Sequence, residues 1–369
     1  MDITLKAREL NAILPSLVAV ADKKNTSQPA LEHLRFETGK RDVSIVAGDL
    51  NLWTFAEALA TVTKPGKGTV SAKMFGDLVS KLDGDEVRLT VLDSFRLRVQ
   101  CGKSKHEIPG MDPTLYPAVP EVSGKWKTVP GASLASGIGG VVHAVSTDET
   151  REHLRGVHVR HRDGRLEFTT SDGHRCARNF VDADLPGMEI VIPSKAAQEI
   201  ARVADGAEKV DVASGKWRGS EWLFVRRDGV TVAAQLMANA FPVVMDMILS
   251  SDHLTSVEVD RAALLSALRR CRITGNQEGK KDPGAEMRLG GDTLTISAGV
   301  DCLEEIDAVS DGPDMRVGVN PILLIDAVSS IDGAKIKINA GGGVNPEIGQ
   351  IIVRPTDGDD IRIVIPMRL

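Results

Sequence analysis

Residues 71–84 read SAKMFGDLVSKLDG, a helical pattern of apolar residues that stops at an Asp-Gly pair. Residues 193–206 and 321–333 repeat the pattern and also end in Asp-Gly. Each copy is followed by a strand pattern, at residues 86–91, 209–212 and 335–338. Glycine just past the last helical turn is the usual left-handed cap, so we expect each helix to end at its Asp-Gly pair. The pairs lie 122 and 127 residues apart, which indicates an internal repeat.

A second helix is predicted at the start of each copy, because three apolar residues recur at i, i+4 and i+7 and share one helical face. The three sets are Leu10, Leu14 and Leu17; Leu134, Ile138 and Val141; and Leu264, Leu268 and Cys271. Strand patterns lie between the two helices of each copy, at residues 42–47, 166–170 and 293–298. We therefore predict three α+β domains at residues 1–125, 126–250 and 251–369. Triplication fits either a larger scaffold or a closed ring with helices on one side and sheets on the other.

The composition is that of a globular protein, with 42% apolar and 26% charged residues among 369. Its net charge is −6. A protein held on DNA by charge alone should be basic, since neutralised phosphates supply non-specific affinity. The acidic balance thus argues against simple electrostatic DNA binding, but it does not exclude a protein that encloses DNA.

Compartment and metal binding can also be judged from the sequence. The N-terminus lacks a signal-peptide pattern, and no apolar run is long enough to span a membrane. The four cysteines are far apart without a C-x-x-C motif, which argues against a zinc site and favours a reducing cytoplasm. His158 and His161 have a metal-binding spacing, but in a strand they point to opposite faces, so we expect surface histidines and no metal.

Four motifs carry a family resemblance. Residues 144–151, AVSTDETR, followed by Leu154 and Gly156-Val157, resemble the second-domain signature of the β subunit of bacterial DNA polymerase III, the replicative sliding clamp. Residues 171–175, SDGHR, and the C-terminal residues 365–369, IPMRL, are similar to two further motifs of that family. Residues 108–122 look like the end of its first domain. The resemblance runs over the whole chain in order.

The resemblance implies three repeated domains of the DNA clamp fold, with helices lining the inside of a ring and β-sheets forming the outside. It implies a head-to-tail homodimer that encircles double-stranded DNA as a cytoplasmic processivity factor, with no catalytic residues, cofactor or metal. The implied protein partners bind through short linear motifs. They are the DNA polymerase III alpha subunit, the clamp loader, other DNA polymerases and repair proteins.

The resemblance also implies a groove for partner peptides. Its residues in this chain are Leu154, Ser171, Gly173, His174, Arg175, Cys176, Pro242, Met247, Ile363, Ile365, Pro366, Met367 and Arg368. Two departures stand out, because residues 243–247 lack the family's tyrosine and basic residue and Cys176 replaces a common leucine. The departure at residues 243–247 leaves open an alternative, a specialised second clamp copy for repair or inhibitor resistance.

Two further sets of residues follow from the resemblance. Candidate DNA-facing residues are Lys23, Lys24, Lys73, Arg151, Lys195, Arg202, Arg269 and Arg270. Candidate dimer residues are His106, Ile108, Arg272 and Ile273. Asp172-Gly173, directly after the strand pattern at residues 166–170, predicts a turn. An unrelated DNA-modifying enzyme remains a third hypothesis, since Asp172 and His174 could also belong to a triad. The chain, however, has no G-x-S-x-G elbow to supply a nucleophile.

Overall fold

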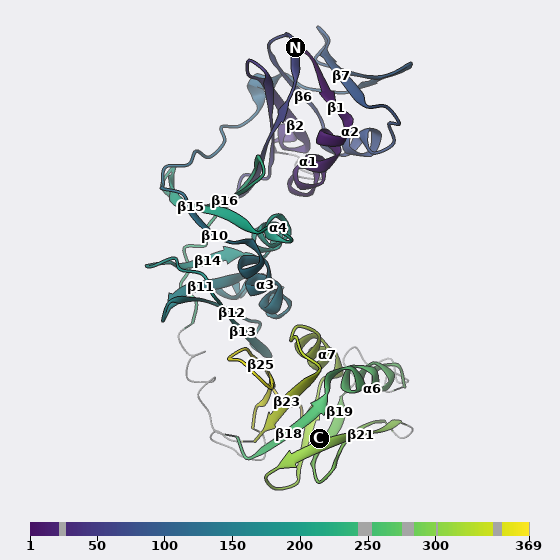
Figure 1. Ribbon diagram of the computed structural model, residues 1–369, viewed down its shortest axis with the longest axis vertical. Coiled ribbons are helices and arrows are strands. Elements are labelled where there is room, and N and C mark those ends of the chain that lie inside the picture. Colours follow the sequence, from purple (N-terminus) through teal and green to yellow (C-terminus); the bar gives the residue numbers. More distant parts are fainter. Residues whose placement is uncertain (22–26, 243–252, 275–283, 300–301, 342–348, 369) are drawn as a thin grey trace. The chain divides into compact units, whose positions relative to one another are not determined.

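The computed structural model describes residues 1–21, 27–242, 253–274, 284–299, 302–341 and 349–368. Along these residues one order of elements occurs three times: a strand, a helix, several strands, a second helix and three strands. We call the three copies the first segment (β1–β9), the second segment (β10–β17) and the third segment (β18–β25). The recurrence confirms the internal repeat (Figure 1).

Each segment contributes two helices. They are α1 Ala7–Val20 and α2 Ala72–Val79, α3 Gly131–Val141 and α4 Ser194–Ala204, and α6 Arg261–Thr274 and α7 Pro321–Ser329. The apolar triplets that predicted a first helix in each copy lie in α1, α3 and α6, and all nine side chains are buried. Helix α1 packs on α2, and α6 packs on α7. The predicted helical faces are therefore confirmed.

The prediction that each second helix ends at its Asp-Gly pair is wrong for two of the three. Helix α4 ends directly before Asp205-Gly206, where Gly206 has a φ of +65°. Helices α2 and α7 end several residues before their pairs. The hydroxyls of Ser80 and Ser330, just past these helices, donate to carbonyls of the last turn, at Asp77 and Ala327. Serine thus satisfies helix-end carbonyls before the glycine is reached.

All the strands pair in an antiparallel sense in three sheets. A five-stranded sheet runs in the order β5 Thr61–Lys64, β1 Asp2–Lys6, β7 Glu86–Val91, β8 Leu97–Cys101, β9 Ser104–Ile108. An eight-stranded sheet runs in the order β10 Lys127–Pro130, β15 Lys209–Trp217, β16 Ser220–Arg227, β17 Val230–Gln235, β4 Leu52–Leu59, β3 Asp42–Gly48, β2 His33–Thr38, β6 Lys67–Ser71.

The third sheet has twelve strands. Its first six are β14 Glu189–Pro193, β11 Gly156–Arg162, β12 Arg165–Ser171, β13 Arg175–Val181, β25 Ile361–Val364 and β24 Ile351–Pro355. The remaining six are β23 Lys335–Ala340, β18 Thr255–Asp260, β21 Cys302–Asp311, β20 Thr293–Ala298, β19 Ala285–Gly290 and β22 Met315–Val319. The strands predicted between the helices are confirmed as β3, β12 and β20.

Two strand pairs join neighbouring segments into continuous sheets. Strand β4 of the first segment pairs with β17 of the second, with Trp53 opposite Ala233. Strand β13 of the second pairs with β25 of the third, with Cys176 opposite Ile363. We call these pairs the first junction and the second junction. Both follow one rule. The third strand after the first helix of one segment, β4 or β13, pairs with the last strand of the next segment, β17 or β25.

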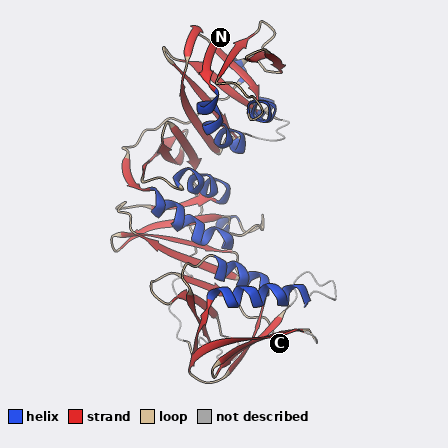
Figure 2. Cartoon of the chain, turned by 45° about the vertical axis from the view of Figure 1, so that its right-hand side comes forward, coloured by secondary structure: helices blue, strands red, loops and turns tan. Residues whose placement is uncertain are grey.

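The junctions hold the chain in two compact units, residues 1–132 with 199–236 and residues 133–198 with 237–369. Each unit carries its helices against its sheets (Figure 2). The first junction lies in the first unit over an aromatic cluster that includes Trp53, Tyr116, Trp222 and Phe224, with Trp126 and Trp217 packed against it. All four tryptophans and the single tyrosine of the chain are thus in this cluster or against it. The main core of the second unit is aliphatic.

Candidate partner-binding site

The turn between β12 and β13 is closed by hydrogen bonds from its own side chains. The Oδ1 atom of Asp172 accepts the N–H groups of His174 and Arg175 at 2.8 and 3.0 Å, and its Oδ2 accepts Nε of Arg175 at 2.9 Å. Ser171 closes the turn from the other side, because its hydroxyl donates to the carbonyl of Arg175 at 2.8 Å. This confirms the turn predicted at Asp172-Gly173 and presents His174 to solvent.

Gly173 is required at the tip of this turn. Its φ is +88°, a conformation that side chains rarely adopt. A Cβ atom there would also lie 2.4 Å from Nη1 of Arg151. That guanidinium donates to the carbonyl of Asp172 at 3.0 Å, so the AVSTDETR segment braces the turn.

The turn is also tied to the third segment. Nη1 of Arg175 binds Oδ2 of Asp326 on α7 at 2.6 Å. The N–H of Ile365 donates to the carbonyl of His174 at 2.9 Å, and the N–H of Met367 donates to the carbonyl of Gly318 on β22 at 2.8 Å. The C-terminal residues therefore run from the turn of the second segment to a strand of the third.

An apolar cluster lies beside this tail. It comprises Leu154, Cys176, Val191, Phe241, Ile352 and Ile363, with Met237 and Ile361 packed against it. Burial raises the pKa of the Cys176 thiol to about 12, so this residue acts as a small apolar side chain. Ile365 is exposed, while Pro366 and Met367 are half-buried, so apolar surface remains open next to the cluster.

The prediction that His158 is a surface residue is wrong. His158 is buried, and its ring stacks on Phe241 with centroids 5.1 Å apart. Phe241, from the aromatic-Pro pair at the end of the second segment, covers this strand. His161 remains half-buried and contacts Asp184 at 2.9 Å.

The structure thus brings the described members of the predicted groove together within one compact unit. Pro242 is half-buried next to Phe241, Arg368 is exposed at the tail, and Met247 lies outside the described residues. The sequence reasoning missed Val191, Phe241, Ile352 and Asp326. The sequence carried a signal for two of them, because Val191 lies on the strand pattern of β14 and Phe241 begins the Phe-Pro pair. It carried no signal for Asp326, the partner of Arg175.

Arg362 is the buried cation of the second junction. Only 1% of this residue is exposed. Its guanidinium donates to Arg178 O at 2.8 Å, Asn179 Oδ1 at 2.6 Å, Ser330 Oγ at 2.7 Å and Ser330 O at 3.0 Å. Burial lowers the pKa of Arg362 to about 10. One cation therefore links β13, β25 and the end of α7 through neutral acceptors.

The predicted DNA-facing residues are dispersed over several elements. Lys73 on α2, Lys195 on α4 and Arg269 on α6 are exposed. Arg202 pairs with Glu199 at 2.8 Å, and Arg270 binds Glu304 with Nε at 2.7 Å. Arg151 lies at the Asp172–Arg175 turn, and it also pairs with Asp148 at 3.4 Å. Lys23 and Lys24 lie outside the described residues.

The predicted dimer residues fall on two elements. His106 and Ile108 lie on β9, the last strand of its sheet; His106 is exposed and Ile108 is buried in the core of the first unit. Arg272 and Ile273 are exposed on the last turn of α6.

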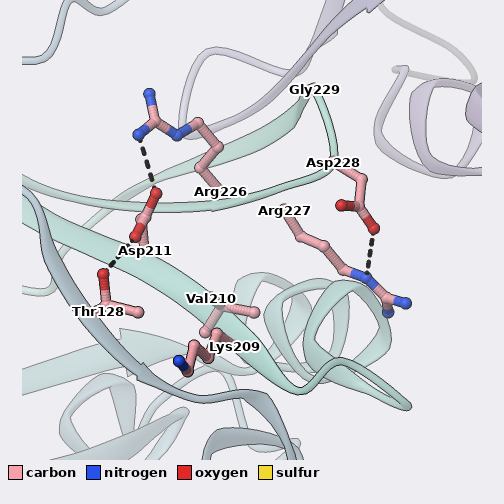
Figure 3. Close-up of a pocket in the computed structure, with 8 residues that line it drawn as sticks. All are labelled: Thr128, Lys209, Val210, Asp211, Arg226, Arg227, Asp228 and Gly229. Atoms are coloured by element: carbon pink, nitrogen blue, oxygen red, sulfur yellow. Dashed lines mark hydrogen bonds and ion pairs between the residues drawn. The ribbon is translucent and has the colours of Figure 1, made fainter.

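Within the described ranges, no helix is long and apolar enough to cross a bilayer. The same ranges contain no group of three His, Cys, Asp or Glu residues placed to hold a metal ion. A pocket beside the first junction is lined partly by side chains that bind one another: Asp211 accepts hydrogen bonds from Thr128 and Arg226, and Arg227 donates to Asp228 (Figure 3).

Comparisons with known proteins agree over the whole chain. Residues 1–120 match the N-terminal domain of the DNA polymerase III beta subunit, and residues 128–243 match its central domain. The chain is 28% identical to the beta sliding clamp of Halalkalibacterium halodurans over 375 residues, which are 95% of each protein. It is 25% identical to that of Synechocystis over 384 residues, 96% of each.

Solved structures agree in fold. The DNA polymerase sliding clamp of Bacillus subtilis matches with a TM-score of 0.90 at 22% identity, over 100% of this chain and 99% of that one. The DNA polymerase III subunit beta of Pseudomonas aeruginosa matches with a TM-score of 0.88 at 22% identity, over the full length of both. The chain belongs to the family of the bacterial DNA polymerase III beta subunit, the beta sliding clamps.

Proposed function

We propose that this chain works as a DNA sliding clamp, a non-catalytic processivity factor that closes as a homodimeric ring around duplex DNA in the cytoplasm. It would tether the replicative polymerase and other partners through short peptide motifs. The three domains would lie near residues 1–125, 126–250 and 251–369. The observation that carries the proposal is the pair of strand edges that the repeat leaves open.

The junction rule identifies these edges. By that rule β21, the third strand after the first helix of the third segment, should pair with the last strand of a first segment, β9, in a second copy of the chain. Residues Cys302–Asp307 of β21 pair with β20, and only Ala308–Asp311 pair with β18. In the described part of the chain, the first half of β21 has no second neighbour, and β9 ends its sheet.

An open edge presents unpaired N–H and C=O groups that template another strand. Joining β9 of one copy to β21 of a second copy would make a third junction of the same kind. Two copies joined twice in this way form a closed head-to-tail ring. Strand β9 carries His106 and Ile108. Ile273 is exposed on the last turn of α6, and the Arg270–Glu304 pair ties that helix to β21.

Charge substitution tests this contact. Ile273 is 77% exposed, and Val309 is 68% exposed on the half of β21 that β18 already covers. Ile273→Asp should weaken the dimer by about 100-fold or more, because an interface must then bury an unpaired carboxylate. Val309→Asp should leave it intact. Sedimentation at several concentrations measures both, and equal dissociation of the two variants would contradict the proposed contact.

DNA retention tests the function itself. The net charge of −6 makes tight contact binding unfavourable, whereas enclosure predicts release only at free ends. Protein loaded on circular DNA by a clamp loader should stay bound in moderate salt, and cutting the circle should release it. Equal retention on circular and linear DNA would indicate an ordinary DNA-binding protein.

For the partner site, we propose that the Asp172–Arg175 turn and the tail form one peptide-binding surface. The apolar side chains of Leu154, Pro242, Ile365 and Met367 would accept leucine and phenylalanine side chains, and the turn would place polar groups. Short motifs of this kind bind with modest affinity, since ordering the peptide opposes the gain from a small contact.

A further inference from the structure

Two cysteines far apart in the sequence meet in the core of the third segment. The Sγ atoms of Cys271 and Cys302 lie 2.9 Å apart, the first on α6 and the second at the start of β21. Both residues are buried and both carry free thiols. We propose that hydrogen peroxide converts this pair reversibly into a disulfide, which locks α6 to the open edge of β21.

The surroundings hold the two sulfurs in place. Next to Cys271, Arg270 binds Glu304, which lies two residues beyond Cys302. The salt bridge and the thiol pair therefore connect the same helix turn to the same strand. Two thiols already in contact need little movement to react, because proximity replaces a search through solution.

The chemistry assigns different roles to the two thiols. In a single copy of the chain, Cys302 is 8% exposed and Cys271 is fully buried, so the oxidant reaches Cys302 first. Its sulfur attacks the peroxide; an S–O bond forms, the O–O bond breaks, and a sulfenic acid and one water result. The sulfur of Cys271 then attacks Cys302, the S–O bond breaks, and a second water leaves. Two thiols lose two electrons, and one peroxide is reduced to two waters.

Burial, together with the neighbouring Cys302 thiol, raises the pKa of the Cys271 thiol. Because the thiolate is the attacking form, the second step should be slow in the intact fold. A pair of this kind resists chance oxidation and responds only to sustained peroxide. In a reducing cytoplasm, disulfides are usually transient and redox-sensing.

The position of the disulfide predicts an effect on dimer strength, and this prediction rests on the proposed dimer. Cys271 precedes Arg272 and Ile273, and Cys302 precedes Leu303, which is exposed on β21. A disulfide would fix the end of α6 against the strand that the partner copy is proposed to cover. Fixing a surface in its bound conformation strengthens association.

Peroxide treatment of the full-length protein, followed by alkylation in denaturant and peptide mapping, tests the cross-link. We expect two of the four cysteines to escape alkylation and a linked peptide to join Cys271 to Cys302, with both effects undone by a thiol reductant. Cys302→Ser, or Cys302→Ala if serine impairs folding, should abolish the link. Cys101→Ser should preserve it, and Cys101 is 7% exposed, so exposure is matched.

Four alkylatable cysteines after treatment would overturn the proposal, as would a sulfinic acid on Cys302 beside a free Cys271. Sedimentation then tests the coupling. The oxidised dimer should dissociate at a concentration lower by about threefold, the scale of pre-ordering a side chain or two. Unchanged dissociation would overturn the coupling. A monomer that still forms the link would instead refute the proposed dimer and leave the disulfide standing.

Discussion

The two junctions use the same strand pairing but are sealed by different chemistry. The first junction is backed by an aromatic cluster, in which Tyr116 donates to the carbonyl of Val46 at 3.2 Å. The second is backed by a buried arginine and leaves Ile365 of the tail exposed. A repeat can therefore reuse one backbone connection for a purely structural joint and for a joint that offers a binding surface.

The difference also gives each junction its own probe. All four tryptophans lie in or against the cluster of the first junction, so tryptophan fluorescence reports that region. Far-ultraviolet circular dichroism reports the whole chain. A perturbation confined to the second junction should therefore shift the dichroism transition and leave the fluorescence transition in place.

The largest effect is expected for Arg362→Ala. It leaves the Oδ1 atom of Asn179 and the carbonyls of Arg178 and Ser330 without the guanidinium donor, in the buried interior. We expect a loss of about 3–5 kcal/mol, the scale for breaking a buried charged network. Thermal unfolding by dichroism measures it. Arg165→Ala is the control. It removes an exposed ion pair with Asp359 and a cation–π contact with the Phe180 ring, and should cost about 1 kcal/mol.

The next-largest effect is expected on acidification, which should lower the stability of the second junction. Burial, together with the charges of Arg362 and Arg175, lowers the pKa of His143 to about 3. The unfolded chain takes up this proton near pH 6.5 and the folded chain does not, so stability falls as pH drops from 6.5 towards 3. The slope is at most about 1.4 kcal/mol per pH unit.

His143→Gln isolates this group, since glutamine cannot titrate. The difference between the two proteins should grow on acidification in the dichroism transition but not in the fluorescence transition. A parallel pH dependence of both proteins would show that His143 is not responsible.

Tyr116→Phe probes the first junction with a smaller change. The hydroxyl donates towards the carbonyls of Val46 and His33, and burial raises the pKa of Tyr116, which keeps it protonated. Losing this donor should cost about 1–2 kcal/mol in the fluorescence transition. A larger shift in the dichroism transition than in the fluorescence transition would contradict the assignment.

The smallest effect concerns Asp211, which ties three strands beside the first junction (Figure 3). Hydrogen bonds from Arg226 and Thr128 lower the pKa of this carboxyl. Its stabilisation is present above pH 3.8 and is lost as pH falls through the lowered pKa. Because the ion pair with Arg226 is partly exposed, Asp211→Asn should lower the free energy of unfolding by under about 1 kcal/mol at neutral pH. In strong acid, where the carboxyl is protonated, it should have no effect.

Local features of the fold could be predicted from the sequence because they depend on spacing. The stripes of α1, α3 and α6 and the Asp172-Gly173 turn follow from periodicity and turn chemistry alone. The junctions could not be predicted in this way. Trp53 on β4 and Trp222 on β16 share one cluster only because β17 pairs with both strands, and nothing near either residue specifies that pairing.

The same reason explains the misses at the candidate site. Cys271 and Cys302 showed no metal or disulfide spacing, yet α6 and β21 bring their sulfurs together. His158 looked like a surface residue because Phe241, which covers it, is 83 residues away. The family motifs located the turn and the tail, but the ion pair of Arg175 with Asp326 required the three-dimensional arrangement.

The central claim is that the second junction carries the partner site, and truncation tests it most directly. A labelled peptide with a Gln and a Leu-Phe pair should bind with a dissociation constant of about 1 μM by fluorescence anisotropy. Deleting residues 367–369 removes the backbone bond from Met367 to Gly318 and part of the apolar surface, and neither Met367 nor Arg368 is a core residue. We predict that peptide binding is lost while dimerisation and both unfolding transitions stay nearly unchanged. Unchanged peptide affinity in the truncated protein would contradict the assignment, and unfolding would show that the tail is structural.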